Sequence, residues 1–495
     1  MIWSCMKTHR LEFWADSFHE GNWACEELSK FFKLKEVSYE QGFIPVFLFQ
    51  INATSEIEIT VLGSYKNWSP LPEPIAELLE WGKPDLVAYD PVGKKILFAM
   101  EETAAVPTGN QALQRCERIY GSLRLGIPFW YLLGEFGLHV DGGVRRDSIW
   151  PTVLGIKLSC IQRTPCMVLH YSDQEHPEDY SVGGGVKSLY TALAIEIEIF
   201  AGKKKRTDLN QILSEQYSHM LRFVESQGAN LVSFVPNKEI LYHADTPMRL
   251  AELVTSGGVL SNNDLDFFNW GKAKELPEEI YEKIKPGGLI KPDLFVDQLE
   301  KLVSKKTAYT LSGNAGSRPQ NVEEVKIWLS QQKALFEVGN TTDATFSLKI
   351  KDFPSSISGR LHVTTAKNVF YLVDSFKDVE AALKQTFPRL SKIKIASLND
   401  LPAFVYISNS LKPGRIFGDP FTGQLSAFAN IFTKNVFGDR TRISIAYYPH
   451  QVHTQLLDRN NKLRRNKGII LMSELLDYAI FQGGVVVDMK SGKII

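Results

Sequence analysis

Two short apolar runs joined by a turn, within residues 84–103, constrain the fold of this chain more than any other stretch. The runs read LVA and ILFAM, and the residues between them include aspartate, proline and glycine, which favour turns. Residues 84–103 are therefore predicted to form a β-hairpin. Because both strands are apolar on each face, the sheet that contains them is expected to be covered by helices on both sides.

Acidic side chains stand at one end of this hairpin. Asp85 begins the first strand, and Glu101 and Glu102 end the second. Antiparallel pairing would bring acids from both strands to one rim of the sheet. Carboxylate oxygens hold Mg²⁺, which activates water and offsets charge on a phosphate, so this rim is a candidate nuclease site. Glu101 and Glu102 point to opposite faces of a regular strand, and a one-residue bulge would exchange their roles; an ion-pair partner is the other interpretation of Glu102.

Helices are predicted on both sides of the hairpin. After it, Thr108 is a candidate cap, and a set of polar residues recurs at helical spacing and could point back at the rim: Gln111, Gln114, Arg115 and Arg118. Before it, Ile75 to Trp81 is predicted to be a helix. Glu77 on that helix is a candidate further metal ligand, with a solvated helix carboxylate as the alternative.

The order Pro-Asp, apolar strand and glutamate resembles the PD-(D/E)xK restriction-endonuclease-like superfamily. Pro84-Asp85 and Glu101 match its first two elements, but Thr103 stands where the superfamily has lysine. A Pro-Asp pair is common by chance, and a second one at Pro292-Asp293 has no apolar hairpin behind it. The local replacements for the missing charge are Arg115, Arg118, Lys94 and Lys95.

This resemblance implies an α/β fold, a restriction-endonuclease-like α/β sandwich with a mixed sheet. It also implies metal-dependent phosphodiester hydrolysis with Mg²⁺ or Mn²⁺. The expected metal ligands are Asp85, Glu101 and Glu77. The expected catalytic set is Asp85, Glu101, Glu102, Thr103, Gln114 and Arg115, with Gln114 or Arg115 orienting the scissile phosphate.

A dense group of cations marks the C-terminal part of the chain. No acid lies among them, which favours contact with phosphate oxygens, although a solvated basic turn has the same composition. They are Arg459, Lys462, Arg464, Arg465 and Lys467. A helix is predicted next, over residues 470–482, and a strand over residues 485–495.

Residues 418–495 resemble the APAZ domain, an analogue of PAZ that is encoded beside short prokaryotic Argonautes. The matching motifs occur in order: Asp419-Pro420 with Thr422-Gly423-Gln424, Ala446 to Val452, Arg465 to Gly468, and Gly483-Gly484. The resemblance implies an α+β domain similar to the N and linker domains of long Argonautes. It also implies a short Argonaute partner with MID and PIWI domains, which holds a guide RNA and a target single-stranded DNA.

A nuclease-like domain ahead of APAZ resembles the DREN-APAZ subunit of short Argonaute defence systems. The domains are placed at 1–235 for the nuclease and 236–495 for APAZ. The resemblance implies that target recognition switches on indiscriminate cleavage of DNA, with RNA as a further candidate substrate, in abortive-infection defence against plasmids and phages. A higher oligomer is expected on activation, because a double-strand break needs two nuclease sites.

Two other interpretations stay open at this point. The first is a stand-alone type II restriction endonuclease whose C-terminal half recognises a duplex sequence. The second is a catalytically inactive scaffold subunit for an Argonaute, motivated by Thr103 at the lysine position.

Composition bounds the class of protein. A length of 495 residues predicts two or three domains, and 56 basic against 56 acidic residues mean that any nucleic-acid-binding surface is local. The five cysteines contain no Cys-x-x-Cys pair, which disfavours zinc and favours a reduced, cytoplasmic setting. No apolar run reaches the length of a membrane span, so no membrane partner is expected.

Further elements are predicted from apolar patterns and turn signals. They are a helix over residues 22–34 capped by Asn22, strands over 43–51, 57–62 and 127–133, and helices over 188–200 and 209–225. The basic run 203–206 between the last two helices is either a solvated turn or a phosphate contact.

Overall fold

The computed structural model describes most of the chain up to residue 264 and shorter parts beyond it. The described ranges are 7–103, 115–134, 150–171, 185–228, 244–261, 264, 336–338, 346–348, 357–363, 368–373, 375–392, 401, 403–408, 426–427, 429–431, 433–434, 436, 442–448 and 451–495.

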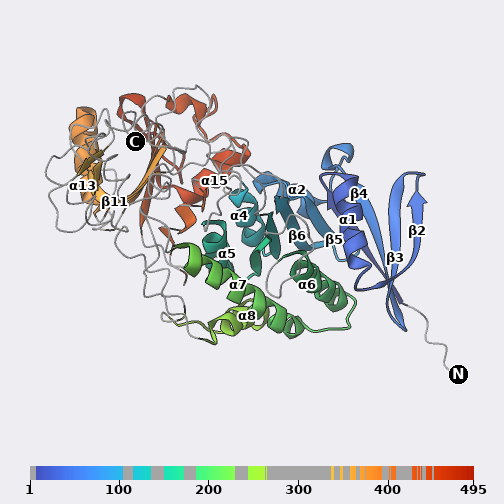
Figure 1. Cartoon of the computed structure of the whole chain (residues 1–495). Coiled ribbons are helices and arrows are strands. Elements are labelled where there is room, and N and C mark those ends of the chain that lie inside the picture. The colour runs from blue at the N-terminus through green and yellow to red at the C-terminus, as the bar shows by residue number, and fades with distance from the viewer. Residues whose placement is uncertain are drawn as a thin grey trace, which may run out of the picture.

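An eight-stranded mixed sheet forms the centre of the N-terminal unit (Figure 1). Its order is β2-β3-β4-β1-β5-β6-β7-β8, and β1, β5 and β6 pair antiparallel whereas β6, β7 and β8 run parallel. The predicted hairpin and the strands predicted near residues 43, 57 and 127 are confirmed. The bounds are β1 Lys7–Ala15, β2 Lys33–Glu40, β3 Ile44–Asn52, β4 Ser55–Gly63, β5 Leu86–Asp90, β6 Lys95–Thr103, β7 Phe129–Gly134 and β8 Cys166–Tyr171.

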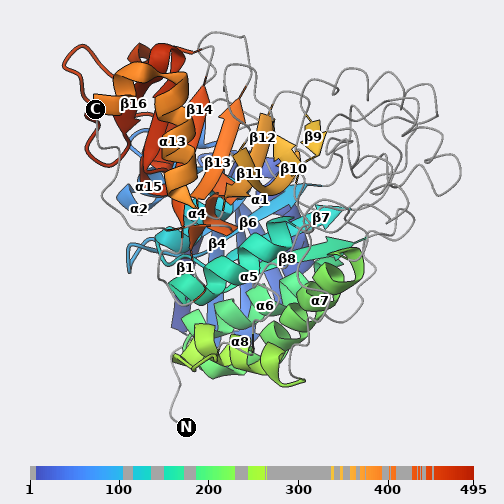
Figure 2. The same ribbon diagram turned by 90° about the vertical axis from the view of Figure 1, so that its left-hand side faces the viewer.

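Helices cover both faces of this sheet, as the apolar strands predict. Helices α1 and α6 lie on the face of Met100, whose sulfur is near the Tyr190 hydroxyl of α6. Helices α2 and α4 lie on the opposite face. Helix α5 packs against β8, and α7 and α8 lie beside α5 (Figure 2). The bounds are α1 Phe18–Leu28, α2 Glu73–Trp81, α4 Cys116–Arg124, α5 Trp150–Gln162, α6 Gly185–Phe200, α7 Asn210–Gly228 and α8 Thr246–Ser256, with short helices η1 Tyr65–Asn67 and η2 Arg206–Leu209.

The first helix starts earlier than predicted. Ser17 and Glu20 form a reciprocal capping box: the Ser17 amide donates to the Glu20 carboxylate at 2.7 Å, and the Glu20 amide donates to the Ser17 hydroxyl at 3.4 Å. The helix therefore runs from Phe18 to Leu28, and Lys33 already lies in β2. The predicted helix is therefore confirmed over residues 22–28, whereas its predicted start, its end at residue 34 and its Asn22 cap were wrong.

A second eight-stranded sheet, in the order β16-β15-β14-β13-β12-β11-β10-β9, forms the C-terminal unit. Strands β13, β14 and β15 are parallel and the remaining pairs are antiparallel. The bounds are β9 Phe336–Val338, β10 Phe346–Leu348, β11 Ile357–Val363, β12 Asn368–Val373, β13 Ala403–Ser408, β14 Ile443–Tyr448, β15 Tyr478–Phe481 and β16 Val485–Asp488. The helices of this unit are α13 Phe376–Thr386, α15 Lys467–Leu475, η6 Pro388–Lys392, η7 His453–Gln455 and η8 Gln482–Gly484.

The helix predicted over residues 470–482 ends early. Helix α15 stops at Leu475, and residues 478–481 form β15 beside β14. A carboxylate oxygen of Asp477 accepts the Ser444 amide at 2.9 Å and so fixes the start of β15 beside the start of β14. The run is mostly apolar on both sides of Asp477, and composition alone does not separate a buried helix from a buried strand.

The two units share a continuous buried core. Every residue of α5 from Trp150 to Cys160 is buried, including Lys157, because α5 lies between the N-terminal sheet and the C-terminal unit. The predicted domain boundary at 235 falls outside the described residues, and α8 beyond it packs on α7 of the N-terminal unit. None of the helices in the described ranges is both long and apolar enough to cross a bilayer.

Candidate active site at one rim of the N-terminal sheet

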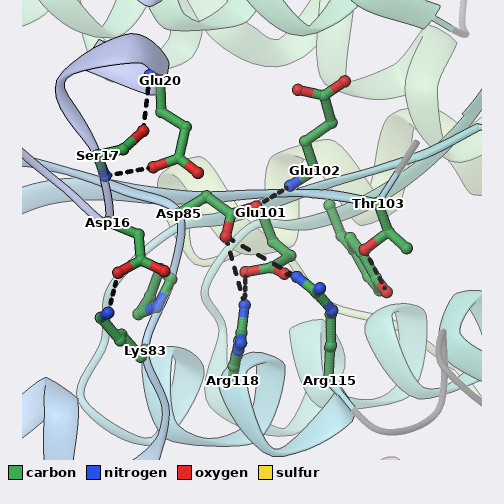
Figure 3. A network of polar contacts seen from close by, with 12 residues as sticks. Asp16, Ser17, Glu20, Lys83, Asp85, Glu101, Glu102, Thr103, Arg115 and Arg118 are labelled. Carbon is green, nitrogen blue, oxygen red and sulfur yellow. Dashed lines mark hydrogen bonds and ion pairs between the residues drawn. The ribbon is translucent and has the colours of Figure 1, made fainter. Parts of the chain in front are cut away.

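The predicted acids meet at one rim of the sheet. Strand β5 begins where β1 and β6 end, and the amide of Asp16 donates to the carbonyl of Asp85 at 3.0 Å. Asp85 accepts the backbone amide of Glu102 at 2.8 Å, which fixes its carboxylate against β6. Figure 3 shows the carboxylates of Asp85 and Glu101 converging at this rim.

Two arginines lie against both acids. Nη1 of Arg115 and Nη1 of Arg118 each form an ion pair with Glu101 and lie 3.8 Å and 3.6 Å from Oδ1 of Asp85. The Glu101 side chain is 0% exposed and that of Asp85 is 15% exposed. A buried carboxylate is costly unless it is paired, so the guanidiniums are what permits Glu101 at this position.

The lysine position of the motif is filled differently. Thr103 is buried, and its hydroxyl lies 3.3 Å from the hydroxyl of Tyr131 on β7. Lys94 and Lys95 lie at the opposite end of β6, beside the β5–β6 turn. Of the predicted replacements, the structure therefore brings Arg115 and Arg118 to the acids and leaves the two lysines remote.

Glu102 faces the other side of the sheet. Its side chain points away from the arginines and toward the side on which α1 carries Glu20 (Figure 3). Burial raises the pKa of Glu20, and the charges of Asp85 and Glu102 raise it further. Asp85 therefore lies between Glu101, on the side of the arginines, and Glu20 with Glu102, on the side of α1 (Figure 3).

Lys83 also belongs to this rim. Its ammonium forms an ion pair with Asp16 and lies 5.5 Å from the ring of Tyr65. The Tyr65 hydroxyl is 3.1 Å from the carbonyls of Trp14 and Pro84, which holds the residue before Asp85 in place. Burial and the charge of Arg118 lower the pKa of Lys83.

Burial controls the ionisation of Asp85. It raises the pKa of this carboxyl, while the Glu102 amide and the two guanidiniums act in the opposite direction. The net shift is upward, so the ionised form of Asp85 depends on the positive groups around it.

The remaining predicted site residues lie elsewhere. Glu77 is exposed on α2, on the side away from the buried Ile75 and Leu78, and no polar contact described for this rim includes it. Thr108, Gln111 and Gln114 lie outside the described residues.

The chemistry of the donor set is compatible with a divalent ion. Asp85 and Glu101 supply two carboxylates, and two guanidiniums between them bring the same positive charge that one Mg²⁺ would bring. Among the described residues no group of three or more His, Cys, Asp or Glu side chains stands in metal-ligand geometry. An ion at this rim would have to displace the arginines from between the acids.

The C-terminal cations form a closed turn. Leu457 pairs with Leu463, and Oδ1 of Asp458 accepts the amides of Asn460 and Lys462 at 2.8 and 2.9 Å. Arg464 donates to the carbonyls of Leu457 at 2.8 Å and Thr454 at 3.3 Å, so it has a structural role in the turn. Arg459, Lys462 and Arg465 are exposed, as is Arg464, and Lys467 is the first residue of α15.

Of the APAZ-like motifs, Asp419 to Gln424 lies outside the described residues. Ala446 to Tyr448 ends β14, and Gly484 has φ +77° with an added Cβ only 2.6 Å from Cβ of Phe387. Glycine is therefore required at position 484 by both its backbone and its neighbour.

Comparison with known proteins finds no match to a family model, a curated protein or a solved structure.

Sequence reasoning missed Glu20, Lys83 and Tyr65. Glu20 was detectable, because Ser17-x-x-Glu20 is a capping-box pattern that places it in the first turn of a helix. Its approach to Asp85 depends on the pairing of β1 with β5, which joins segments about seventy residues apart and has no local signal.

Proposed function

We propose that this chain is the nuclease effector subunit of a short Argonaute complex, a metal-dependent phosphodiester hydrolase. The observation that carries the nuclease part is that one guanidinium nitrogen of Arg115 and one of Arg118 each reach both Asp85 and Glu101. Acids from adjacent strands thus share one small space beside cations, as phosphodiester cleavage requires. The antiparallel β1-β5-β6 and the parallel β7 after α4 also agree with a restriction-endonuclease-like sheet.

Each residue has a role in this proposal. Asp85 and Glu101 would hold Mg²⁺ or Mn²⁺, which supplies an activated water and charge neutralisation. Arg115 and Arg118 take the place of the missing lysine and bind the non-bridging oxygens of the phosphate. Thr103 orients Tyr131 and contributes no charge.

The Argonaute part rests on the motifs of the C-terminal unit. A short Argonaute with MID and PIWI domains would hold a guide RNA and a target single-stranded DNA. Arg459, Lys462 and Arg465 are exposed on a rigid turn and suit contact with the phosphates of the guide-target duplex. Recognition of a target then switches on cleavage of unrelated DNA, which serves defence against plasmids and phages.

Cleavage of an unrelated plasmid tests the proposal. The chain is combined with a short Argonaute, a guide RNA and its complementary DNA, with and without Mg²⁺. Asp85→Asn and Glu101→Gln, which keep size and shape, should each reduce cleavage by about a hundredfold or more. Glu73→Gln, an exposed acid at the start of α2, is the matched control and should keep the wild-type rate.

Three other outcomes are informative. If Glu102→Gln and Glu20→Gln abolish cleavage and Glu101→Gln does not, the ion binds on the α1 side of Asp85. Site-specific cutting by the chain alone would indicate a type II restriction endonuclease. Assembly with the Argonaute without any cleavage would indicate a scaffold subunit.

A further inference from the structure

Strand β2 is an open edge of the N-terminal sheet. Its only neighbour in the described sheet is β3, and all eight of its residues are exposed. It lies at the end of the molecule opposite the C-terminal unit (Figure 1). An edge strand presents a row of backbone N–H and C=O groups that can pair with another strand.

Large apolar side chains surround this edge. Five of the nine large apolar residues that are exposed in the described chain fall between positions 31 and 43, and we call these five the β2 shelf. An exposed apolar cluster of this density marks a contact surface. The β2 shelf consists of Phe31, Leu34, Val37, Tyr39 and Phe43.

A bulge aligns part of the shelf on one face. The register of β2 against β3 shifts between Leu34 and Glu36. Because of the extra residue, Leu34 points to the same face as Val37 and Tyr39 instead of the opposite one. Lysines and bulges can protect edges from pairing, whereas exposed apolar side chains on an edge strand favour it, and β2 has three of them on one face.

The sequence of β2 is complementary to itself when it is reversed. Read antiparallel against a second copy, KLKEVSYE places Lys33 opposite Glu40 and Leu34 opposite Tyr39. Twofold symmetry repeats each pair, so the contact has two ion pairs and two apolar pairs of this kind. Lys33 and Glu40 are both exposed, and neither forms an ion pair with another described residue.

We propose that β2 is the surface through which two copies of this chain associate, by antiparallel pairing of β2 with β2 about a twofold axis. The two N-terminal sheets then continue into each other, and each assembly has two Asp85–Glu101 rims. This extends the proposed function, because two rims are what a double-strand break needs, but self-association is measured without any cleavage assay. Failure of either proposal leaves the other intact.

Charge reversal on β2 tests the contact. Sedimentation velocity of the full chain over a concentration series should show a monomer–dimer equilibrium, weakened roughly tenfold by Lys33→Glu or by Glu40→Lys, since each puts like charges opposite each other twice. The double variant Lys33→Glu/Glu40→Lys should recover wild-type association. A mixture of the two single variants should recover it as well, because their heterodimer has only opposite charges across the strand pair.

The control is Lys95→Glu, an exposed lysine at the start of β6, which should associate as the wild type does. Thermal melting verifies that each variant is folded. Single variants that sediment like the wild type would overturn the proposal. So would a mixture that fails to recover, or a wild-type chain that stays monomeric up to about 100 µM.

Discussion

The positive charge that β6 lacks at Thr103 comes from helix α4. Arg115 and Arg118 occupy the space between two acids, one of which is completely buried. A lysine at position 103 would stand on the same strand as Glu101, whereas Arg115 and Arg118 reach the acids from the start of α4. The same side chains can therefore neutralise Asp85 and Glu101 in the absence of an ion and contact a phosphate in its presence.

Removal of one guanidinium tests whether the arginines neutralise the acids in the absence of an ion. Arg118→Gln leaves Glu101 with a single cation, so the free energy of unfolding should fall by about 3 kcal/mol. Mg²⁺ should then stabilise the variant more than the wild type, because it can take the vacated space between the acids. Urea unfolding with and without MgCl₂ measures both effects.

The matched control is Arg124→Gln at the other end of α4. Arg124 is half-exposed and pairs with Glu474 at the surface, so its loss should cost less than about 1 kcal/mol and leave the Mg²⁺ response unchanged. Equal Mg²⁺ responses in Arg118→Gln and the wild type would contradict a metal role for Asp85 and Glu101.

At the scale of elements, α4 connects the rim to the C-terminal unit. Arg115 is its N-cap residue and Arg118 lies in its first turn. Further along, the Tyr120 hydroxyl donates to Glu474 of α15 at 2.5 Å. Lys434 lies 5.5 Å from the Tyr120 ring. Gly121 lets α4 approach α2 closely, since an added Cβ would lie 2.1 Å from Cβ of Trp81. The position of α4 is thus determined by both units.

Tyr120→Phe isolates the polar link between the units. The variant keeps the ring and loses the hydrogen bond to Glu474, so the free energy of unfolding should fall by about 1 kcal/mol. Tyr89→Phe, a buried tyrosine on β5 away from the C-terminal unit, is the control for loss of a hydroxyl. Limited proteolysis should cut between the units faster in Tyr120→Phe than in the control; equal rates would show that α4 does not depend on this bond.

Local signals predicted some elements and not others. The hairpin was predictable because Asp90 turns the chain by accepting the amides of Val92 and Gly93 at 3.0 and 2.9 Å, a pattern visible in the sequence. The alternation that would have indicated strand β2 is interrupted by the bulge between Leu34 and Glu36, so Lys33 and Leu34 were assigned to the preceding helix. Asp85 and Glu101 were found from the hairpin alone, whereas Glu20 needed the distant pairing of β1 with β5.

For the whole molecule, the junction between units contains a buried charge. The Lys157 ammonium donates to the carbonyl of Ile431 in the C-terminal unit. Burial and the charge of Arg442 lower the pKa of Lys157 to about 7. The junction was not predictable from the sequence, because α5 was not predicted as a helix and Ile431 is far away in the chain.

This shift predicts a pH dependence of stability. Between pH 7 and the ordinary lysine value of 10.5, the unfolded chain holds a proton on Lys157 that the folded chain does not. The contribution of Lys157 to the free energy of unfolding should therefore rise with pH over this window and stay constant below pH 7. Lys157→Gln keeps a donor for Ile431 and should remove this rise in urea unfolding at pH 7 to 10. Lys95→Gln, on the surface, should retain it; an unchanged slope in Lys157→Gln would contradict the assignment.

Helix α5, buried on every side, also limits how the chain can be divided. If the first 260 residues were expressed alone, the side of α5 that packs on the C-terminal unit would be exposed to solvent. Such a fragment should aggregate or recruit chaperones, even though it contains a complete sheet. Gene fusions or engineered variants that exchange the second half would need a surface that packs on α5 in the same way. The residues of the two halves that meet at α5 are therefore expected to change together over evolution.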